Sequence, residues 1–142
     1  MNSPSVLYRI AAILLFLFAC GHTAGFLSFK PSTSEGMAVL TAMNSVAFDF
    51  AGDSRTYGGF YIGFGLTVTA YLLFSAFIAW HLGRLAASQS GGISPLAWAL
   101  VAVQLLSLAL SVKYFFLVPV VFSALVIACL VWATLRLRRA SV

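Results

Sequence analysis

Four long apolar runs in a chain of 142 residues constrain the fold more than any other feature of the sequence. The hydrocarbon core of a bilayer is about 30 Å thick, and a helix crosses it with about 20 residues. Runs of that length cover residues 6–29, 57–80, 93–112 and 118–137. Backbone N–H and C=O groups in lipid must be satisfied within their own segment, which favours helices. The sequence therefore predicts an all-α membrane protein, an antiparallel bundle of four transmembrane helices.

The scarcity of charge supports the same conclusion. Charged residues make up 8% of the chain and hydrophobic residues 62%, whereas an ordinary soluble domain is about 25% charged. So few charges cannot cover a water-facing surface, so we expect the lipid bilayer to surround most of the protein. Four spans leave no room for a second domain, and residues 1–142 are expected to form a single integral membrane domain.

The positive charges are distributed unevenly between the two sides of the predicted bundle. One side carries five arginines, namely Arg9, Arg84, Arg136, Arg138 and Arg139. The other side carries Lys30, Arg55 and Lys113. Because basic residues accumulate on the cytoplasmic side of membrane proteins, we expect both termini to be cytoplasmic. The net charge of +5 is thus interpreted as topology rather than as a nucleic-acid surface. The absence of a eukaryotic targeting pattern favours a bacterial inner membrane.

The predicted outer loop, residues 30–56, contains all three carboxylates of the chain, Glu35, Asp49 and Asp53. Ser32 and Glu35 have the spacing of a capping box, which predicts a helix starting there. Apolar residues recur on one side of residues 36–48, so we expect a short amphipathic outer helix. The composition of residues 52–56 is typical of a turn.

Two pairs of glycines have the spacing that allows close contact between membrane helices. Gly21 and Gly25 lie in the first run, and Gly59 and Gly63 lie in the second. Glycines four residues apart remove side chains from one ridge, so two backbones can approach. Both pairs lie in the outer halves of their helices at similar depth. The sequence therefore predicts tight packing of the first two spans at these glycines.

His22 is an ionisable residue about 12 Å inside the outer boundary, counting from Lys30 at the helical rise. An ionisable group at that depth is a functional hypothesis by default. In one interpretation it is a neutral histidine hydrogen-bonded to a neighbouring backbone group or hydroxyl. In the other, Asp49 or Asp53 approaches it, and the pair relays a proton or binds a polar headgroup.

Two further groups of polar residues are candidates for a site. Charged and aromatic residues converge with glycine at the outer mouth, where a small-molecule vestibule is expected if one exists. Its candidates are His22, Asp49, Asp53, Arg55, Tyr57, Tyr61 and Lys113. The second group either makes hydrogen bonds between helices or lines an internal cavity. Its members are Thr67, Tyr71, Gln104 and Ser107.

No pattern in the sequence assigns a catalytic residue, a metal ligand or a cofactor. His22 and His81 lie about 15 Å or more apart in depth, so they cannot face each other across one haem. The three acids and two histidines lack the spacing of a metal site. No glycine-rich phosphate loop or nucleophile elbow is present. We therefore expect neither a metal nor a cofactor.

With these residues noted, the chain resembles an uncharacterised family of small bacterial four-helix membrane proteins. The resemblance depends on residues 21–26 (GHTAGF), on residues 55–65 (RTYGGFYIGFG), and on Tyr114-Phe115-Phe116 with Pro119. It supplies no activity and no catalytic residue. The layout is also similar, more distantly, to that of DoxX-type four-helix membrane proteins, with an arginine early in the first span and glycines opening the second.

Three functions are compatible with these features. The first is a binding or accessory membrane protein that associates with lipid, with partner membrane subunits or with itself. The second is a membrane enzyme on a lipophilic substrate, in which His22 acts with an outer-loop carboxylate. The third is a quinone- or redox-linked subunit that uses His22 and Tyr61 to hold a headgroup. Because catalysis requires groups within hydrogen-bond reach, the enzyme hypothesis depends on the distance from His22 to Asp49 or Asp53.

Overall fold

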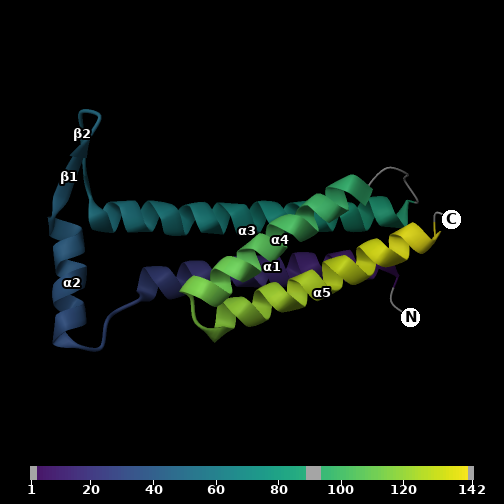
Figure 1. Cartoon of the computed structure of the whole chain (residues 1–142), viewed down its shortest axis with the longest axis horizontal. Coiled ribbons are helices and arrows are strands. Elements are labelled where there is room, and N and C mark those ends of the chain that lie inside the picture. The colour runs from purple at the N-terminus through teal and green to yellow at the C-terminus, as the bar shows by residue number, and fades with distance from the viewer. Residues whose placement is uncertain (1–2, 89–93, 141–142) are drawn as a thin grey trace. The chain divides into compact units, whose positions relative to one another are not determined.

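The computed structural model of the chain describes residues 3–88 and 94–140. Within these ranges the helices and strands follow one another as α1 (Pro4–Ser28), α2 (Ser34–Ser45), β1 (Ala47–Phe50), β2 (Asp53–Thr56), α3 (Tyr57–Ala87), α4 (Ser94–Tyr114) and α5 (Leu117–Ala140) (Figure 1). Helices α1, α3, α4 and α5 are long and apolar enough to cross a membrane. The predicted all-α membrane class is therefore confirmed.

The predicted spans match these helices closely, with one clear difference. Residue 93, the predicted start of the third span, lies outside the described residues. Helix α3 has 31 residues, or about 46 Å at the helical rise, which exceeds the hydrocarbon core of about 30 Å. It does not end near Trp80 as expected but continues to Ala87. Its last turns therefore extend beyond the length needed to cross the bilayer.

The contacts of the chain fall into two compact units. The first unit contains Met1–Phe18 and Leu72–Val142, and the second contains Ala19–Tyr71. Helices α1 and α3 contribute residues to both units. Helices α4 and α5 belong to the first unit, and α2 with strands β1 and β2 belongs to the second. The sequence predicted a single domain, and the two units have separate contact networks.

Leucines and alanines together fill the interior of the first unit, whereas some of its phenylalanines lie on its outside. Phe74 and Phe77 are 64% and 63% exposed. The buried alanines are Ala11, Ala12, Ala76, Ala79, Ala97 and Ala133. In lipid this arrangement is favourable, since lipid tails are as apolar as the side chains and association depends on close packing. The outward aromatic and branched residues are therefore expected to contact acyl chains.

A buried tyrosine connects three helices of the first unit. The Tyr8 side chain of α1 is fully buried, and its hydroxyl lies 2.9 Å from Oγ1 of Thr134 on α5. The Thr134 hydroxyl donates to the carbonyl of Leu130 at 2.7 Å, so Tyr8 must be the donor to Thr134. On α3, a Cβ at Gly83 would lie 3.4 Å from Cβ of Tyr8 and 3.2 Å from the Ser5 carbonyl. Gly83 therefore permits close contact inside α3 rather than ending the helix.

In the second unit, α2 begins one residue later than the capping box predicts. The N-cap is Thr33, whose Oγ1 accepts a hydrogen bond from the Gly36 backbone N–H at 3.1 Å. Ser32, the predicted cap, lies before it. Hydrogen bonds from the Glu35 backbone and from the Ser34 hydroxyl lower the pKa of the Glu35 carboxyl. An ionised carboxylate in the first turn is favourable at a helix N-terminus.

Helix α2 ends at Ser45 rather than at residue 48, because the chain then enters a β-hairpin. Strands β1 and β2 pair antiparallel, from Ala47 opposite Thr56 to Phe50 opposite Asp53. The two turn residues, Ala51 and Gly52, both have positive φ, at 52° and 89°. Such turns match the twist of a two-residue hairpin and favour Asn-Gly or Asp-Gly. The alanine in the first position explains why the sequence did not indicate a hairpin.

The hydroxyl pair of Tyr8 and Thr134 yields a stability prediction. We expect Tyr8→Phe to lower the free energy of unfolding by about 0.6 kcal/mol, the average for hydrogen bonds between membrane helices. Thr134→Val should cost more, about 1–3 kcal/mol, because it leaves a buried tyrosine donor unsatisfied. The double variant should be no less stable than Thr134→Val alone. Unfolding equilibria in detergent micelles measure all three variants, and strictly additive losses would contradict the pairing.

Candidate functional site

The outer ends of α1 and α3, in the second unit, are held together by polar contacts around His22. Nε2 of His22 lies 3.1 Å from the carbonyl oxygen of Gly65. One residue on, Oγ1 of Thr23 lies 2.8 Å from Oγ1 of Thr69. Histidine and threonine from α1 therefore meet glycine and threonine from α3 in two adjacent contacts, which we call the outer clasp.

The protons of the outer clasp can be assigned by counting donors. Thr23 donates its single hydroxyl proton to the carbonyl of Ala19 at 2.8 Å, so Thr69 must donate to Thr23. The Gly65 carbonyl is a second, more distant acceptor for the Thr69 hydroxyl, at 3.2 Å. That carbonyl also accepts from His22, which places the imidazole proton on Nε2. The His22 side chain therefore makes a structural contact between α1 and α3.

A phenylalanine of α1 packs closely on a glycine of α3 in this part of the chain. A Cβ at Gly65 would lie 2.6 Å from the Phe26 ring, so no other residue fits there without a shift. The Phe26 ring is flanked by His22, with ring centroids 5.1 Å apart, and by Tyr61 at 6.4 Å. Gly65 and Phe26 stand in the two quoted motifs, but the sequence did not indicate that they contact each other. The sequence signal that could have indicated this contact is a pair of polar residues, His22 and Thr23, in the first span and a glycine and a threonine four residues apart, Gly65 and Thr69, in the second.

The predicted glycine ridges do not make the contact between α1 and α3. A Cβ at Gly21, Gly25 or Gly63 would have no atom of the described residues within 4 Å. At Gly59 it would approach only Oγ1 of Thr56, the residue that opens its own helix. The prediction of tight packing at these four glycines is therefore wrong, since the aromatic ring of Phe26 occupies the contact through Gly65 instead.

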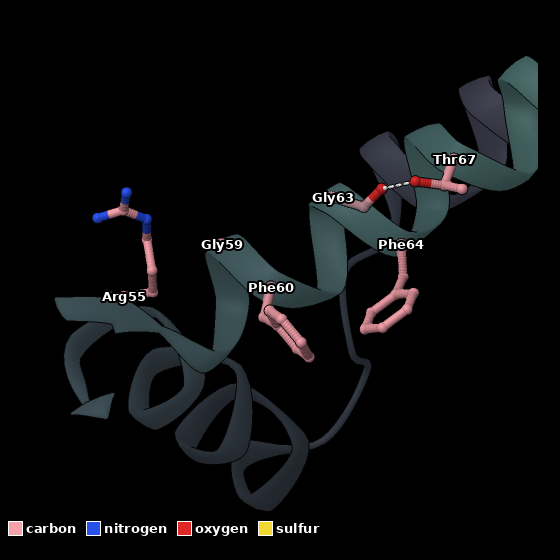
Figure 2. A pocket seen from close by; sticks show the side chains of 6 residues that line it. All are labelled: Arg55, Gly59, Phe60, Gly63, Phe64 and Thr67. Carbon is pink, nitrogen blue, oxygen red and sulfur yellow. Dashed lines mark hydrogen bonds between the residues drawn. The ribbon is translucent and has the colours of Figure 1, made fainter. Parts of the chain in front are cut away.

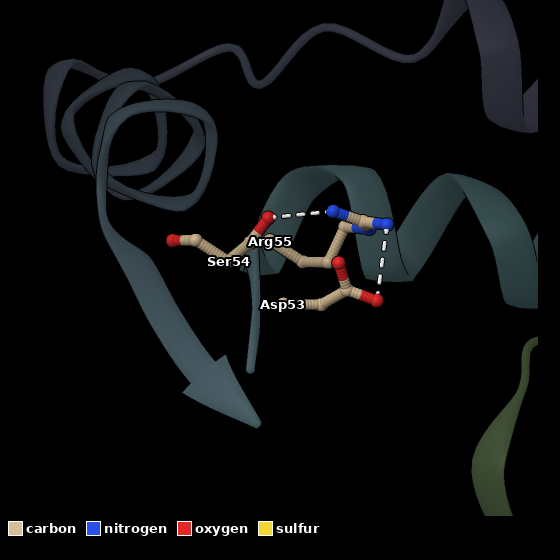
Figure 3. A network of polar contacts seen from close by, with 3 residues as sticks. All are labelled: Asp53, Ser54 and Arg55. Atoms are coloured by element: carbon tan, nitrogen blue, oxygen red, sulfur yellow. Dashed lines mark hydrogen bonds and ion pairs between the residues drawn. The ribbon is translucent and has the colours of Figure 1, made fainter. Parts of the chain in front are cut away.

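The predicted pairing of His22 with an outer-loop carboxylate is not formed. Asp53 lies 3.6 Å from the Arg55 guanidinium, which also donates to the Ser54 carbonyl at 2.9 Å (Figure 3). Asp49 lies exposed on β1, opposite Ser54. Among the described residues, neither carboxylate makes an ion pair or hydrogen bond with His22. The carboxylates are confined to the hairpin, which pairs with itself, while His22 is turned toward α3.

The remaining vestibule candidates are divided between the two units. The Tyr57 ring packs against Phe48 of the hairpin, with centroids 5.0 Å apart, and Phe48 also meets Phe60 edge-on at 5.5 Å. These contacts attach the hairpin to the first turns of α3. Lys113 belongs to the first unit, where its ammonium lies 5.1 Å from the Tyr114 ring centroid.

An open groove of about 440 Å³ runs along α3 in the second unit. Gly59, Gly63 and Thr67 lie at successive turns, Phe60 and Phe64 flank them, and Arg55 lies at the end nearest the hairpin (Figure 2). The rings of Phe60 and Phe64 lie edge to face at 4.7 Å. We call this feature the α3 groove. Its floor is formed by backbone because two of its residues have no side chain.

The other polar candidates are placed differently from one another. The Thr67 hydroxyl donates to the Gly63 carbonyl of its own helix at 2.9 Å, so it satisfies itself within α3. Gln104 on α4 is 1% exposed, as an amide within lipid requires. Tyr71 and Ser107 are half-buried. Within residues 3–88 and 94–140, no group of three or more histidine, cysteine or carboxylate side chains could hold a metal ion.

The contrast between two neighbouring glycines yields a prediction. Gly65→Ala should destabilise the protein by about 1–3 kcal/mol, the usual cost of overpacking, because its methyl group would overlap the Phe26 ring. Gly63→Ala, two residues away, should be neutral or stabilising by up to about 1 kcal/mol, because alanine favours the helix and meets no neighbour. Thermal unfolding in detergent measures both, and equal effects would contradict the packing of Phe26 on Gly65.

The contacts of this region are those of helix packing beside an apolar groove. A scan of the chain against protein-family models found no match, and searches among curated proteins and among solved structures found none either.

Proposed function

We propose that this protein is an accessory membrane protein that binds a partner transmembrane helix along the α3 groove. The observation that carries the proposal is the uncovered glycine floor at Gly59 and Gly63. In membranes, small residues at four-residue spacing allow another helix to approach closely, and such contacts are a main source of helix association. The partner helix is either a second copy of this chain or a different membrane subunit.

The surroundings of the groove support a protein helix as its occupant. Phe60 and Phe64 are 53% and 60% exposed and provide large apolar flanks. A helix packs its ridges into such a depression between side chains. The enzyme hypothesis lacks the contact it requires, because His22 is engaged with Gly65 rather than with a carboxylate. The quinone hypothesis is weakened for the same reason, because Nε2 of His22 already donates to the Gly65 carbonyl and is not available for a quinone headgroup.

Photo-crosslinking in intact membranes of the native host tests this proposal. A photoreactive phenylalanine analogue replaces Phe60 or Phe64, both of which line the groove. We expect a discrete protein adduct at both positions, and about a tenfold loss of it when Gly63→Ile fills the groove, equivalent to about 1.4 kcal/mol of association. Gly63→Ile should not disturb the fold, since apart from the adjacent backbone of α3 no described atom lies within 4 Å of that Cβ.

The matched control places the same analogue at Phe77, which is similarly exposed on α3 but outside the groove. It should give no adduct of that mass. Mass spectrometry of the adduct identifies the partner as a second copy or another subunit. Adducts to lipid alone, or equal adducts at Phe77 that Gly63→Ile leaves unchanged, would overturn the proposal.

We also propose that both termini face the cytoplasm, in a bacterial inner membrane. The five arginines on one side of the predicted topology, against two lysines and one arginine on the other, support this orientation. We further propose that the chain is related to the family of small bacterial four-helix membrane proteins that it resembles.

Reporter fusions test the orientation. A fluorescent protein at the C-terminus, which folds only in the cytoplasm, should be bright. Alkaline phosphatase, which is active only outside, should be active when inserted at the hairpin turn after Gly52 and inactive at the C-terminus. The reverse pattern of phosphatase activity would reverse the orientation.

A further inference from the structure

Charge is strongly segregated between the two units of the chain. The three carboxylate side chains, Glu35, Asp49 and Asp53, all belong to the second unit. The first unit contains no acidic side chain and six basic ones, namely Arg9, Arg84, Lys113, Arg136, Arg138 and Arg139. No side chain of its own unit can therefore neutralise a guanidinium there.

Arg9 makes a contact between α1 and α3, and Arg84 lies on the same face of α3. The guanidinium carbon of Arg9 lies 5.6 Å from the ring centroid of Trp80. The stem of Arg9 lies against α3 at Gly83, where a Cβ would be 3.3 Å from its Cγ. Arg84 follows Trp80 by four residues, so the two share a face of α3. Arg9 and Arg84 thus approach the same face from two helices.

The cations on this face are accessible. Arg9 and Arg84 are exposed, and Trp80 is 46% exposed. The Arg84 guanidinium makes no ion pair or hydrogen bond with a described residue. Arg9 lies over the indole, a contact that orients the planar guanidinium without using its hydrogen-bond donors. Both arginines keep their donors available for an oxygen anion.

The neighbouring side chains are apolar and suit the tails of a lipid. One helical turn from Arg9, Ile13 is 51% exposed, and three residues before Trp80, Phe77 is 63% exposed. Tryptophan belongs at the level of the headgroups, where its ring meets both water and hydrocarbon. Arginine matches phosphate with paired N–H donors. The face therefore presents cations, then an interfacial aromatic ring, then apolar side chains. This order matches the phosphate, the interfacial region and the acyl chains of a phospholipid.

We infer that Arg9, Arg84 and Trp80 form a binding site for the headgroup phosphate of an anionic phospholipid, whose acyl chains lie along Ile13 and Phe77. We call it the Arg9–Arg84 site. It is separate from the α3 groove, since one belongs to the first unit and the other to the second. The inference does not depend on the proposed helix partner. An uncharged or zwitterionic headgroup is disfavoured because two cations without an acidic neighbour attract net negative charge.

Native mass spectrometry of the purified protein, titrated with phosphatidylglycerol or phosphatidylcholine, tests the inference. We expect one phosphatidylglycerol to be retained preferentially over phosphatidylcholine. Arg9→Gln and Arg84→Gln should each weaken its binding about fivefold, which corresponds to about 1 kcal/mol per arginine at a membrane surface. Lys113→Gln is the matched control, because it removes the same charge from the same unit without touching the site.

A second measurement separates local binding from a general effect of charge. In the variant carrying Trp98→Phe and Trp132→Phe, Trp80 is the only remaining tryptophan. Brominated phosphatidylglycerol should quench its fluorescence more strongly than brominated phosphatidylcholine, and Arg84→Gln should remove the difference. Circular dichroism shows whether each variant is folded. Equal retention of the two lipids, or equal losses in Lys113→Gln and the two arginine variants, would overturn the inference.

Discussion

Close backbone approach is the constraint on which the rest of this structure depends. In water, large apolar side chains would be drawn into the interior, but lipid offers them an equally apolar environment. Contact between helices must then come from packing and internal hydrogen bonds. The interior of the first unit contains alanines between leucines, and Gly83 admits the Ser5 carbonyl and the Tyr8 side chain of α1. The phenylalanines of α3 lie outside, where they meet acyl chains at no cost.

The same constraint determines how polar groups are treated. A hydroxyl within lipid has no water to bind, so each one either returns to its own helix or connects two helices. Thr67 does the first, through the Gly63 carbonyl, and Tyr8 with Thr134 does the second. His22 belongs to the second kind, because its Nε2 binds the Gly65 carbonyl. The position of His22 within a predicted membrane span indicated that it needs a polar partner. That partner is a backbone carbonyl of α3.

The sequence predicted the elements that depend on length and composition, but not those that depend on the fit of particular atoms. Four apolar runs predict four spans, because bilayer thickness alone sets their length. The contact glycines were missed because Gly65 and Gly83 have no partner glycine at spacing four. What selects them is the Phe26 ring and the Ser5 carbonyl of α1, both distant in sequence. The hairpin was missed because Ala51 takes a left-handed conformation that alanine rarely adopts.

The glycines of the chain thus divide into two groups, and the difference bears on function. At Gly65 an added Cβ would overlap the Phe26 ring, and at Gly83 it would make tight contacts at 3.2–3.4 Å, so the fold favours glycine at both positions. At Gly63 the fold has no such need, yet glycine in a helix interior is about 1 kcal/mol less favourable than alanine. Glycine at position 63 therefore lowers the stability of α3, and no close contact with another described part of the chain compensates for it. A partner seated in the α3 groove supplies the contact that the chain does not make with itself.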